Sequence, residues 1–575
     1  MKRGLFLYFL GFSLFQLLAV TLLPLDAATL RILHAGLLLA GAFFLWEGPR
    51  PLALGGGLLS LAVYAGLLLR WRPVALSGGV TGPAELLLAA LALLCLLAAG
   101  LICSPTLTLL AGVFLLYNFA GPLIPGLFGH AGFSLRRVLR FFFWGTQGVF
   151  GTGAGVSSTY LFTFVLFGAL LRTGGFLDLV NDLALRAVGK SRGGAAKIAV
   201  LSSALLGTVN GSAVANVAAT GSLTIPMMER SGYPKELAAA VEAAASTGGQ
   251  FMPPVMGAVG FVMAELLGVR YTAVMAAALL PALLFYGALL LAVDLQARRL
   301  GLREAEESAS APLSWRLHLL LPLILLVGLM AAGYTPLYSC VAAALLTPLV
   351  SSLRAGTRRS PSAWLEALAE GARSAVTVGV SCLIIGLIIG TVTLTGVGLT
   401  AGSALLRLAN AGRLLSCGLA AALLSLLLGT GVPGVAAYVI VSAVAAPALV
   451  QAGAPVLAAH LFCLFYACLA NLTPPVAISA VTAAGIAGAN RTKTALRALS
   501  LAVPGLALPL CFLLRPALLL GLSPFGAICL ALLPTLFGVA LLTCACQGWC
   551  FGPCPLWRRL LLFLGAGLLL FLPLP

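Results

Sequence analysis

The chain has 575 residues, of which 61% are hydrophobic and only 8% are charged, and its formal net charge is +18. Soluble domains carry about 25% charged residues, so the composition excludes a soluble globular protein. The apolar residues must face lipid, where one helical span needs ~20 of them. The basic excess is typical of Arg and Lys gathered in short cytoplasmic loops. No basic stripe with interleaved aromatic residues is present, so we expect no nucleic-acid partner.

Roughly fifteen to seventeen apolar stretches follow one another along the chain. The first three are at 4–23, 30–46 and 51–69; two more lie between 84 and 123, and another is at 157–171. Short Arg-containing connections indicate a helical bundle, not the alternating strands of an outer-membrane barrel. The first stretch also suits a signal peptide, but further spans follow at once and we expect a retained helix. We predict an all-α polytopic membrane protein.

A long internal repeat is visible between residues 205–255 and 427–476. Gly207-Thr208 matches Gly429-Thr430 at an offset of 222, and Pro253-Pro254 matches Pro474-Pro475 at an offset of 221. Pro226, Gly232 and Pro234 keep the second offset with Pro447, Gly453 and Pro455. Transporters are often built from two such halves of inverted topology.

The charges around the two copies predict that they are inverted. Lys190, Arg192 and Lys197 precede the first copy, and Arg230 and Lys235 lie within it. Residues 414–490 contain no charged residue. By the positive-inside rule, the ends of the first hairpin lie at the cytoplasmic face and those of the second lie outside.

Each copy carries two helix interruptions. The first is a glycine-rich tip, at 207–212 and 429–434, where a broken helix re-enters the membrane as a hairpin, which is tolerable only where the backbone lines a protein cavity. The second is the diproline, which removes N–H donors and frees carbonyls of the preceding turn. Freed carbonyls suit a cation, and half-helix N-termini suit a carboxylate.

Polar side chains cluster at these interruptions and supply the hard oxygen donors that sodium prefers. The predicted cation ligands are Asn210, Thr247, Gly249, Gln250, Thr430, Ala470, Asn471 and Thr473. The predicted substrate-binding residues are Ser212, Asn216 and Thr220, spaced along one helix face, with Gly431 and Gly434 in the second tip. No metal other than sodium, no organic cofactor and no catalytic residue is predicted.

The sequence at 148–171, 207–226, 242–265 and 466–480 resembles the large membrane subunit of the tripartite ATP-independent periplasmic (TRAP) transporters. The order and spacing are similar to the subtype in which a four-helix small subunit is fused ahead of the large one. Asn216 stands where many members have Asp, although the fused subtype often has Asn there.

The resemblance implies an elevator-type secondary transporter in the inner (cytoplasmic) membrane, driven by sodium. An extracytoplasmic solute-binding protein would deliver a small organic acid. The domains predicted are a small-subunit-like scaffold at 1–125, a transport region at 126–513 with repeats at about 190–293 and 413–513, and a hydrophobic extension at 514–575. A stand-alone sodium/carboxylate symporter, which needs no binding protein, is the alternative.

Other classes fit less well. An intramembrane metalloprotease needs a His-Glu-x-x-His motif, which is absent from the sequence. An ATP-driven permease rarely has inverted hairpins. Cys544, Cys546, Cys550 and Cys554 are spaced unlike a standard zinc motif, and we interpret them as structural or incidental rather than as a metal or disulfide site.

Two acids and one histidine lie in the apolar sequence of the repeats. Glu242 either carries protons or pairs with a basic group such as Arg172, and the pairing is favoured because membrane acids are usually partnered. Glu265 is expected near the interface, close to Arg270. His460 is expected to be a packed helix residue.

Overall fold

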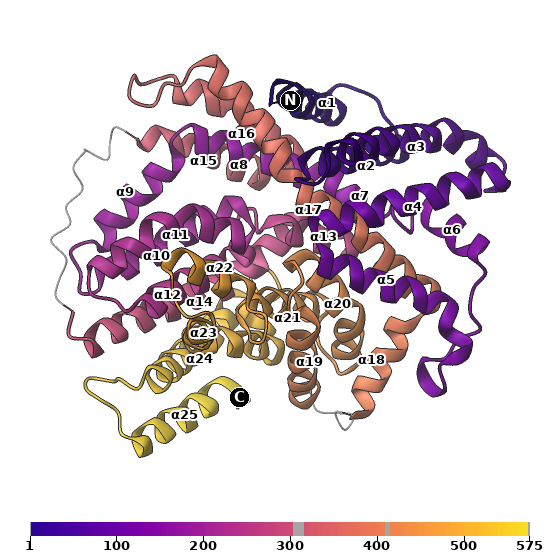
Figure 1. Ribbon diagram of the computed structural model, residues 1–575. Coiled ribbons are helices and arrows are strands. Elements are labelled where there is room, and N and C mark those ends of the chain that lie inside the picture. Colours follow the sequence, from indigo (N-terminus) through magenta and orange to yellow (C-terminus); the bar gives the residue numbers. More distant parts are fainter. Residues whose placement is uncertain (1, 303–315, 409–413, 573–575) are drawn as a thin grey trace. The chain divides into compact units, whose positions relative to one another are not determined.

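A computed structural model describes residues 2–302, 316–408 and 414–572. Its elements are helices, in the order labelled in Figure 1, and Trp549 and Pro553 form an isolated antiparallel β-bridge. Eleven of the described helices are long and apolar enough to cross a membrane, and seven shorter apolar helices accompany them. The predicted all-α polytopic fold is confirmed. Residues 303–315, in the longest polar connection, lie outside the described ranges.

Contacts divide the chain into two compact units. Unit 1 comprises Met1–Gly175 and His318–Ala401, and unit 2 comprises Phe176–Leu317 and Gly402–Pro575. The helices of unit 1 are α1 (Lys2–Thr21), α2 (Ala27–Leu45), α3 (Arg50–Leu76), α4 (Pro83–Cys103), α5 (Pro105–Ala120), α6 (Leu135–Phe143), α7 (Thr152–Val156), α8 (Phe162–Thr173), α15 (Leu321–Ala331), α16 (Pro336–Ser351) and α17 (Pro361–Thr395). Helix α18 (Val397–Leu408) begins in unit 1 and ends in unit 2.

The first six predicted spans are confirmed as α1 to α5 and the segment from α7 to α8. Four helices of unit 1, namely α4, α5, α16 and α17, begin at a proline. Proline suits the first helical position because its fixed φ matches the helix and its missing N–H would have no helical partner there. Ser157–Leu161 forms a single π-turn between α7 and α8.

Helix α17 is the axis of unit 1, with 35 residues and a length of about 50 Å. Its glycines admit close neighbours. A Cβ placed on Gly371 would lie 2.6 Å from Leu166, and one on Gly386 would lie 2.8 Å from the carbonyl oxygen of Gly148. A row of small residues lets membrane helices approach closely and gain dispersion contacts. The helices of unit 1 that pack on α17 include α1, α2, α4, α5 and α8.

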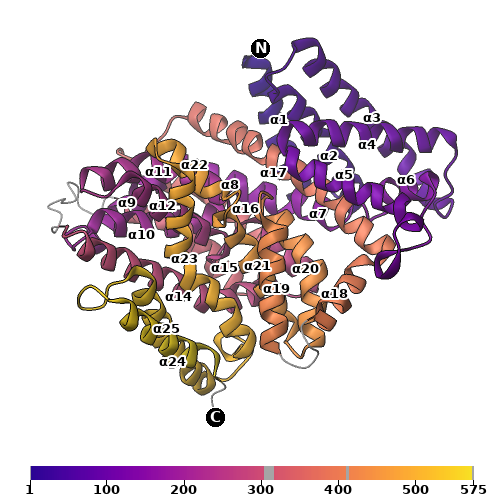
Figure 2. The ribbon, with the colours of Figure 1, turned by 60° about the horizontal axis from the view of Figure 1, so that its bottom comes forward.

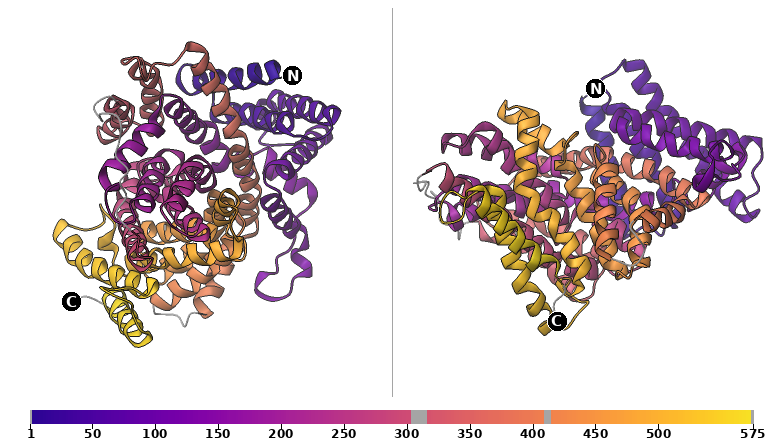
Figure 3. Two further views of the ribbon diagram at one scale, coloured as in Figure 1. Left: turned by 60° about the vertical axis from the view of Figure 1, so that its left-hand side comes forward. Right: turned by 90° about the horizontal axis from the view of Figure 1, so that it is seen from below.

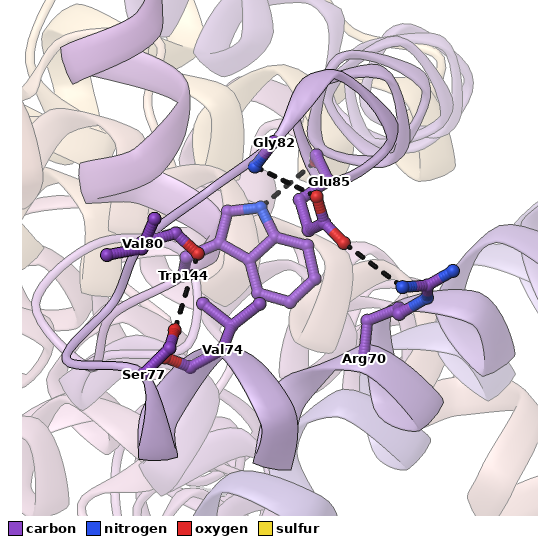
Figure 4. Close-up of polar contacts among 7 residues, drawn as sticks. All are labelled: Arg70, Val74, Ser77, Val80, Gly82, Glu85 and Trp144. Atoms are coloured by element: carbon purple, nitrogen blue, oxygen red, sulfur yellow. Dashed lines mark hydrogen bonds and ion pairs between the residues drawn. The ribbon is translucent and has the colours of Figure 1, made fainter.

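Trp144 joins residues on both sides of the predicted boundary at 125/126 (Figure 4). Its indole N–H donates to the carbonyl oxygen of Glu85 on α4, at 3.1 Å. The Glu85 carboxylate accepts from the Gly82 N–H at 2.9 Å and forms an ion pair with Arg70 of α3 at 3.3 Å. Trp71 stacks on Trp144, with ring centroids 6.2 Å apart. Both sides of that boundary therefore belong to unit 1, and the predicted domain boundaries remain predictions.

Unit 2 contains the two copies of the repeat. The first copy is α10 (Gly194–Asn210), α11 (Ala213–Arg230), α12 (Lys235–Gly248), α13 (Gly257–Leu267) and α14 (Tyr271–Arg299). The second is α19 (Leu414–Gly429), α20 (Gly434–Gln451), α21 (Val456–Leu469), α22 (Ile478–Ala487) and α23 (Arg491–Leu514). The unit also holds α9 (Phe176–Val188), α24 (Phe525–Gln547) and α25 (Leu556–Phe571).

The backbone of the two copies matches in detail. Short 3₁₀ turns end the helices before each diproline, at Gly249–Phe251 and Ala470–Leu472, which keep the offset of 221. Met256 and Ala477 both adopt positive φ, of 54° and 43°, directly before the next helix. The structural repeat is therefore confirmed, and its inverted orientation in the membrane remains a prediction.

The C-terminal helices α24 and α25 lie side by side at the yellow end of the chain in Figures 2 and 3. Helix α24 also packs on α14 and α23, the last helices of the two copies. The four clustered cysteines lie at the end of α24 and in the turn that leads to α25. All four are free thiols.

The close approach of α7 to α17 predicts a steric test of unit 1. A Cβ on Gly153 would lie 2.3 Å from the carbonyl oxygen of Cys382, a backbone atom that cannot rotate away. We expect Gly153→Ala to destabilise the protein by about 1–3 kcal/mol, the usual cost of overpacking. Thermal unfolding of the purified protein in detergent would measure the loss.

Gly328→Ala on α15 is the matched control, because a Cβ there would meet no atom within 4 Å. Its higher helix propensity should leave stability unchanged or raise it by up to about 1 kcal/mol. Equal unfolding temperatures for the two variants would contradict the proposed contact between α7 and α17.

Candidate functional site

The first hairpin is formed by α10 and α11, which meet at a two-residue tip. Gly211 adopts φ +61°, a conformation that glycine takes without strain. Ser212 caps α11 by accepting from the Ala215 N–H at 3.4 Å. The second hairpin, α19 and α20, turns through Gly431, whose φ is +76°. Both glycine-rich interruptions are therefore helix–turn–helix hairpins, as predicted.

The first tip contacts the backbone on both sides of the first diproline. A Cβ on Gly207 would lie 2.4 Å from the Cα of Gly249, and one on Gly211 would lie 2.0 Å from the Cα of Gly257. The Val255 N–H donates to the Thr208 carbonyl oxygen at 3.1 Å. The sequence therefore places glycine where two interrupted helices touch through their main chains.

The second tip makes a related contact with its own diproline segment. A Cβ on Gly429 would lie 2.7 Å from the Cβ of Ala470. Gly431 lies against the side chain of Val476. In both copies the hairpin tip therefore packs on the helix break that follows it in sequence.

The turns before the diprolines partly satisfy the carbonyls that were predicted to be free. The Gly249 oxygen accepts from the Met252 N–H at 3.4 Å, and the Ala470 oxygen accepts from the Thr473 N–H at 3.1 Å. A carbonyl oxygen has two lone pairs, so each of these oxygens retains acceptor capacity. Both residues are buried.

Gln250 and Asn471 join the two breaks. They occupy the same position in the two copies, and the Asn471 side-chain N–H donates to Gln250 Oε1 at 3.2 Å. Both side chains are buried. The Gln250 amide nitrogen also lies against Gly434, where a Cβ would approach it to 2.6 Å. A residue of the first break therefore contacts both the second break and the start of α20.

Glu242 lies at the centre of a second polar cluster, inside the first copy. Its side chain is completely buried, with 0% of its surface exposed. Oε1 accepts from Ser203 at 2.8 Å, from Thr220 at 2.5 Å and from Ser246 at 2.9 Å, and Oε2 accepts from Thr224 at 2.5 Å. Within the described part of unit 2, Glu242 forms no ion pair. Hydroxyl groups therefore take the place of the predicted basic partner.

Asn216 lies between the two clusters. Its amide nitrogen donates to the Ser203 carbonyl oxygen at 2.8 Å and would lie 3.3 Å from a Cβ on either Gly207 or Gly249. Its Oδ1 atom is buried and has no hydrogen-bond partner. An unpaired buried amide oxygen is costly, and it is a suitable ligand for a cation or for the N–H or O–H of a substrate.

Comparison with known proteins identifies the family. The family model described as "Tripartite ATP-independent periplasmic transporter, DctM component" matches residues 90–523. The chain belongs to this family. Together with the candidate spans, membership makes it a multi-pass inner-membrane protein of a transporter family rather than of an enzyme family. The match begins inside the predicted small-subunit-like region.

Curated relatives of the chain agree with the family. A TRAP transporter large permease protein of Haemophilus influenzae is 30% identical over 193 residues, and the C4-dicarboxylate TRAP transporter large permease protein DctM of Pseudomonas aeruginosa is 35% identical over 196. The 2,3-diketo-L-gulonate TRAP transporter large permease protein YiaN of Escherichia coli is 28% identical over 196. Each match covers 33% of this chain and 45% of the relative. The crystal structure of the Alcanivorax borkumensis YdaH transporter is a more distant match, at 18% identity and a TM-score of 0.48, covering 75% of this chain and 98% of that one.

The structure brings most predicted site residues to the tips and breaks of unit 2. Gly249, Gln250, Gly434, Ala470 and Asn471 gather there, as the contacts above show. Thr247, Thr430 and Thr473 lie beside them in sequence, and their hydroxyls donate to main-chain oxygens of their own helices at 2.8, 2.8 and 3.1 Å. Ser212 is at the first tip and Gly431 at the second. The Asn210 side chain lies outside the described residues.

Thr220 is not at the tip. It is two turns into α11, and its hydroxyl faces Glu242. Ser203 and Thr224 are partners of this acid that were not predicted from the sequence. Thr224 continues the four-residue spacing of Ser212, Asn216 and Thr220, so an extension of that helix face would have found it. Ser203 had no such signal, because it comes from another helix.

The structure also shows the surroundings of Glu265, Arg270 and His460. Glu265 and Arg270 are both exposed near the end of α13. The His460 imidazole Nδ1 is 2.9 Å from the Tyr438 hydroxyl, a contact between α21 and α20. In the described part of the chain, no group of three or more His, Cys, Asp or Glu residues is arranged to hold a metal ion.

The bond between Gln250 and Asn471 predicts energetic coupling between the two copies. In a double-mutant cycle of Gln250→Ala and Asn471→Ala, we expect a coupling free energy of about 0.5–1.5 kcal/mol, because either single change removes the same hydrogen bond. Thermal or denaturant unfolding in detergent would measure it.

The matched control replaces Asn471→Ala in the cycle with Thr492→Ala, an exposed threonine at the start of α23. Its effect should add to that of Gln250→Ala within about 0.5 kcal/mol. Additive behaviour of Gln250→Ala and Asn471→Ala as well would show that the two breaks are not coupled through this bond.

Proposed function

We propose that the chain is the permease of a sodium-coupled secondary transporter that imports small organic anions delivered by an extracytoplasmic solute-binding protein. Its membership of the TRAP family supports this function. Relatives are named for C4-dicarboxylates and for 2,3-diketo-L-gulonate, which are both organic anions. The observation that carries the proposal is the meeting of two helix breaks from two copies, joined through Gln250 and Asn471.

The chemistry of the breaks suits sodium. The buried oxygens there belong to carbonyls, amides and hydroxyls, which are hard donors of the kind that bind hard cations. The carbonyl oxygens of Gly249 and Ala470 each keep one free lone pair. The first hairpin tip packs on Gly249 and the second packs on Ala470. Asn216, whose amide nitrogen lies beside Gly207 and Gly249, adds a further unpaired oxygen, its Oδ1. In the proposed cycle, sodium bound here would hold each tip against its break.

The chemistry of the tips suits an anion. Helices α11 and α20 both begin at a tip, at Ala213 and Gly434. The first turn of a helix presents unpaired N–H groups and the positive end of the helix dipole. We place the substrate carboxylate between the two tips, with Ser212, Gly431 and Gly434 around it. Recognition by main-chain groups explains why the side chains reveal little about which acid is carried.

The proposed mechanism is an elevator-type movement that exposes the site to each side of the membrane in turn. Both hairpins and both broken helices belong to unit 2, which supports their movement as one transport domain. The long helix α17 and residues 1–125 would form the scaffold, the latter as a fused small subunit. We assign no transport role to 514–575.

Uptake into proteoliposomes is the direct test of this function. The purified full chain would be reconstituted and offered a panel of labelled organic acids, with and without an inward sodium gradient and with and without its solute-binding protein. We expect uptake only when both the gradient and the binding protein are present. Sodium-driven uptake without the binding protein would instead establish a stand-alone symporter, and uptake indifferent to sodium would contradict the proposed coupling.

The proposed sodium ligands predict a change in sodium affinity. Asn471→Ala combined with Thr247→Ala removes two side-chain oxygens near the breaks. We expect the sodium concentration for half-maximal uptake to rise about tenfold, which corresponds to about 1.4 kcal/mol of binding free energy. Thr492→Ala is the control and should leave it unchanged. An unaltered sodium dependence of the double variant would refute these ligand assignments.

A further inference from the structure

The polar cluster around Glu242 is not part of the symmetric framework of the two copies. At the offset of 221, Glu242, Thr220, Thr224 and Ser246 correspond to Cys463, Val441, Ala445 and Ala467. Ser203 corresponds to Ser425 at the earlier offset of 222. The second copy thus has one hydroxyl, one thiol and otherwise apolar side chains at these positions, and no acid. The fold of a copy does not need an acid there, so Glu242 requires another explanation.

A buried acid without a cationic partner is much more stable in its neutral, protonated form than in its ionised form. Moving an ionised carboxylate out of water without a compensating charge costs many kcal/mol, and such a group usually becomes neutral by binding a proton. Glu242 is completely buried on α12, and its polar contacts are hydroxyl groups. Hydroxyls bring no net charge, so they leave the charge of the carboxylate uncompensated.

The hydroxyl shell can nevertheless satisfy the acid in both protonation states. A hydroxyl both donates and accepts. Against the ionised carboxylate, all four hydroxyls can donate. When the acid is protonated at Oε2, its O–H can donate to Thr224 Oγ1, which then turns its own hydrogen to the Thr220 carbonyl oxygen, 3.0 Å away. When the acid is protonated at Oε1, Thr220 can respond in the same way toward the Asn216 carbonyl oxygen, at 2.8 Å.

The cluster is also connected to the tip of the first hairpin. Ser203 bonds Glu242 through its hydroxyl, and its carbonyl oxygen accepts from Asn216. Asn216 in turn lies beside Gly207 and Gly249, where the tip packs on the break. Three of the four hydroxyls come from α10 and α11, the two arms of the hairpin. An opening of the hairpin would therefore pull the shell away from α12 and admit water to the carboxyl group.

Several helices packed against α12 carry other titratable groups. One is Tyr286 of α14, whose hydroxyl donates to the Ala245 carbonyl oxygen at 2.8 Å. Helix α22 has no titratable residue. The others are Lys197 on α10, paired with Asp294 on α14; Glu229 and Arg230 on α11; Tyr271, Arg298 and Arg299 on α14; His460, Cys463, Tyr466 and Cys468 on α21; and Arg491, Lys493, Arg497 and Cys511 on α23.

We infer that Glu242 is a proton-binding site of the transport domain, which takes up one proton when the first hairpin opens to one side of the membrane and releases it on the other. The bound proton converts the carboxylate into a neutral carboxylic acid, and its release restores the carboxylate and returns the proton to water. The coupling of this proton to uptake rests on the proposed function, whereas its binding to Glu242 does not.

Infrared difference spectroscopy of the full chain in lipid tests the binding directly. Between acidic and alkaline buffer, we expect a carbonyl stretching band of a protonated carboxyl group that is present at low pH, disappears as pH rises and is absent from Glu242→Gln. Glu265→Gln, which changes an exposed acid of the same copy, should retain the band. Thr224→Val should keep the band but shift its frequency, because it removes the hydrogen-bond partner of Oε2.

The spectra can overturn the inference in three ways. A wild-type band that does not change between pH 5 and pH 9 would show that Glu242 does not exchange protons. A band that persists in Glu242→Gln would belong to another acid. A carboxylate signal that responds to sodium chloride but not to pH would make the cluster a metal-ion site instead.

Transport of a labelled C4-dicarboxylate tests the coupling. The binding protein would be present, sodium equal on both sides and the membrane potential clamped. If one proton is coupled, an outside pH one unit below the inside pH should raise substrate accumulation up to about tenfold. Glu242→Gln should lose this stimulation and still exchange internal for external substrate, whereas Glu265→Gln should behave as wild type. Retained stimulation in Glu242→Gln would overturn the coupling. If wild-type protein transports no acid under any condition, the proposed function fails, and the infrared titration still decides whether Glu242 binds a proton.

Discussion

In lipid, no water is available to satisfy the ends of a broken helix, and this constraint governs the architecture of unit 2. Each interruption of a membrane helix must find protein groups to replace its missing partners. The tip of the first hairpin does so by placing Gly207 and Gly211 directly on Gly249 and Gly257, so that two main chains touch. The second tip packs on its own break through Gly429 and Ala470. The breaks are tolerated because they occur in facing pairs.

The same pairing concentrates polar groups in an otherwise apolar protein. The carbonyls and amides around the breaks retain unused acceptors, and Gln250 and Asn471 bring the equivalent positions of the two copies into contact. Repetition of one supersecondary unit therefore produces the proposed site at the place where its two copies meet. Helix dipoles add a preference for anions at the tips, and the chain needs few charged side chains near the site.

The two copies differ where polarity extends beyond the breaks. The first copy surrounds Glu242 with four hydroxyls, and the second has Cys463 with Ser425 and apolar side chains at the matching positions. The two copies share one framework, and a few side chains that differ between them give the first copy a buried acid. Unit 1 follows a different principle: small residues along α17 allow several helices to pack on one long axis, and no acid is buried among them in the described residues.

The sequence by itself determined the membrane class, the first spans, the repeat and the position of both helix breaks, because hydrophobicity, glycine and proline act through local physics. It also singled out Gln250, Asn471 and Glu242 as unusual. Only the tertiary structure decided how these residues are used. Nothing local to Gln250 predicts its bond to a residue 221 positions away, and the hydroxyls around Glu242 come from three helices. Thr220, predicted to bind substrate from one face of the returning helix, donates to Glu242, because the direction of a side chain depends on which helices pack against its own.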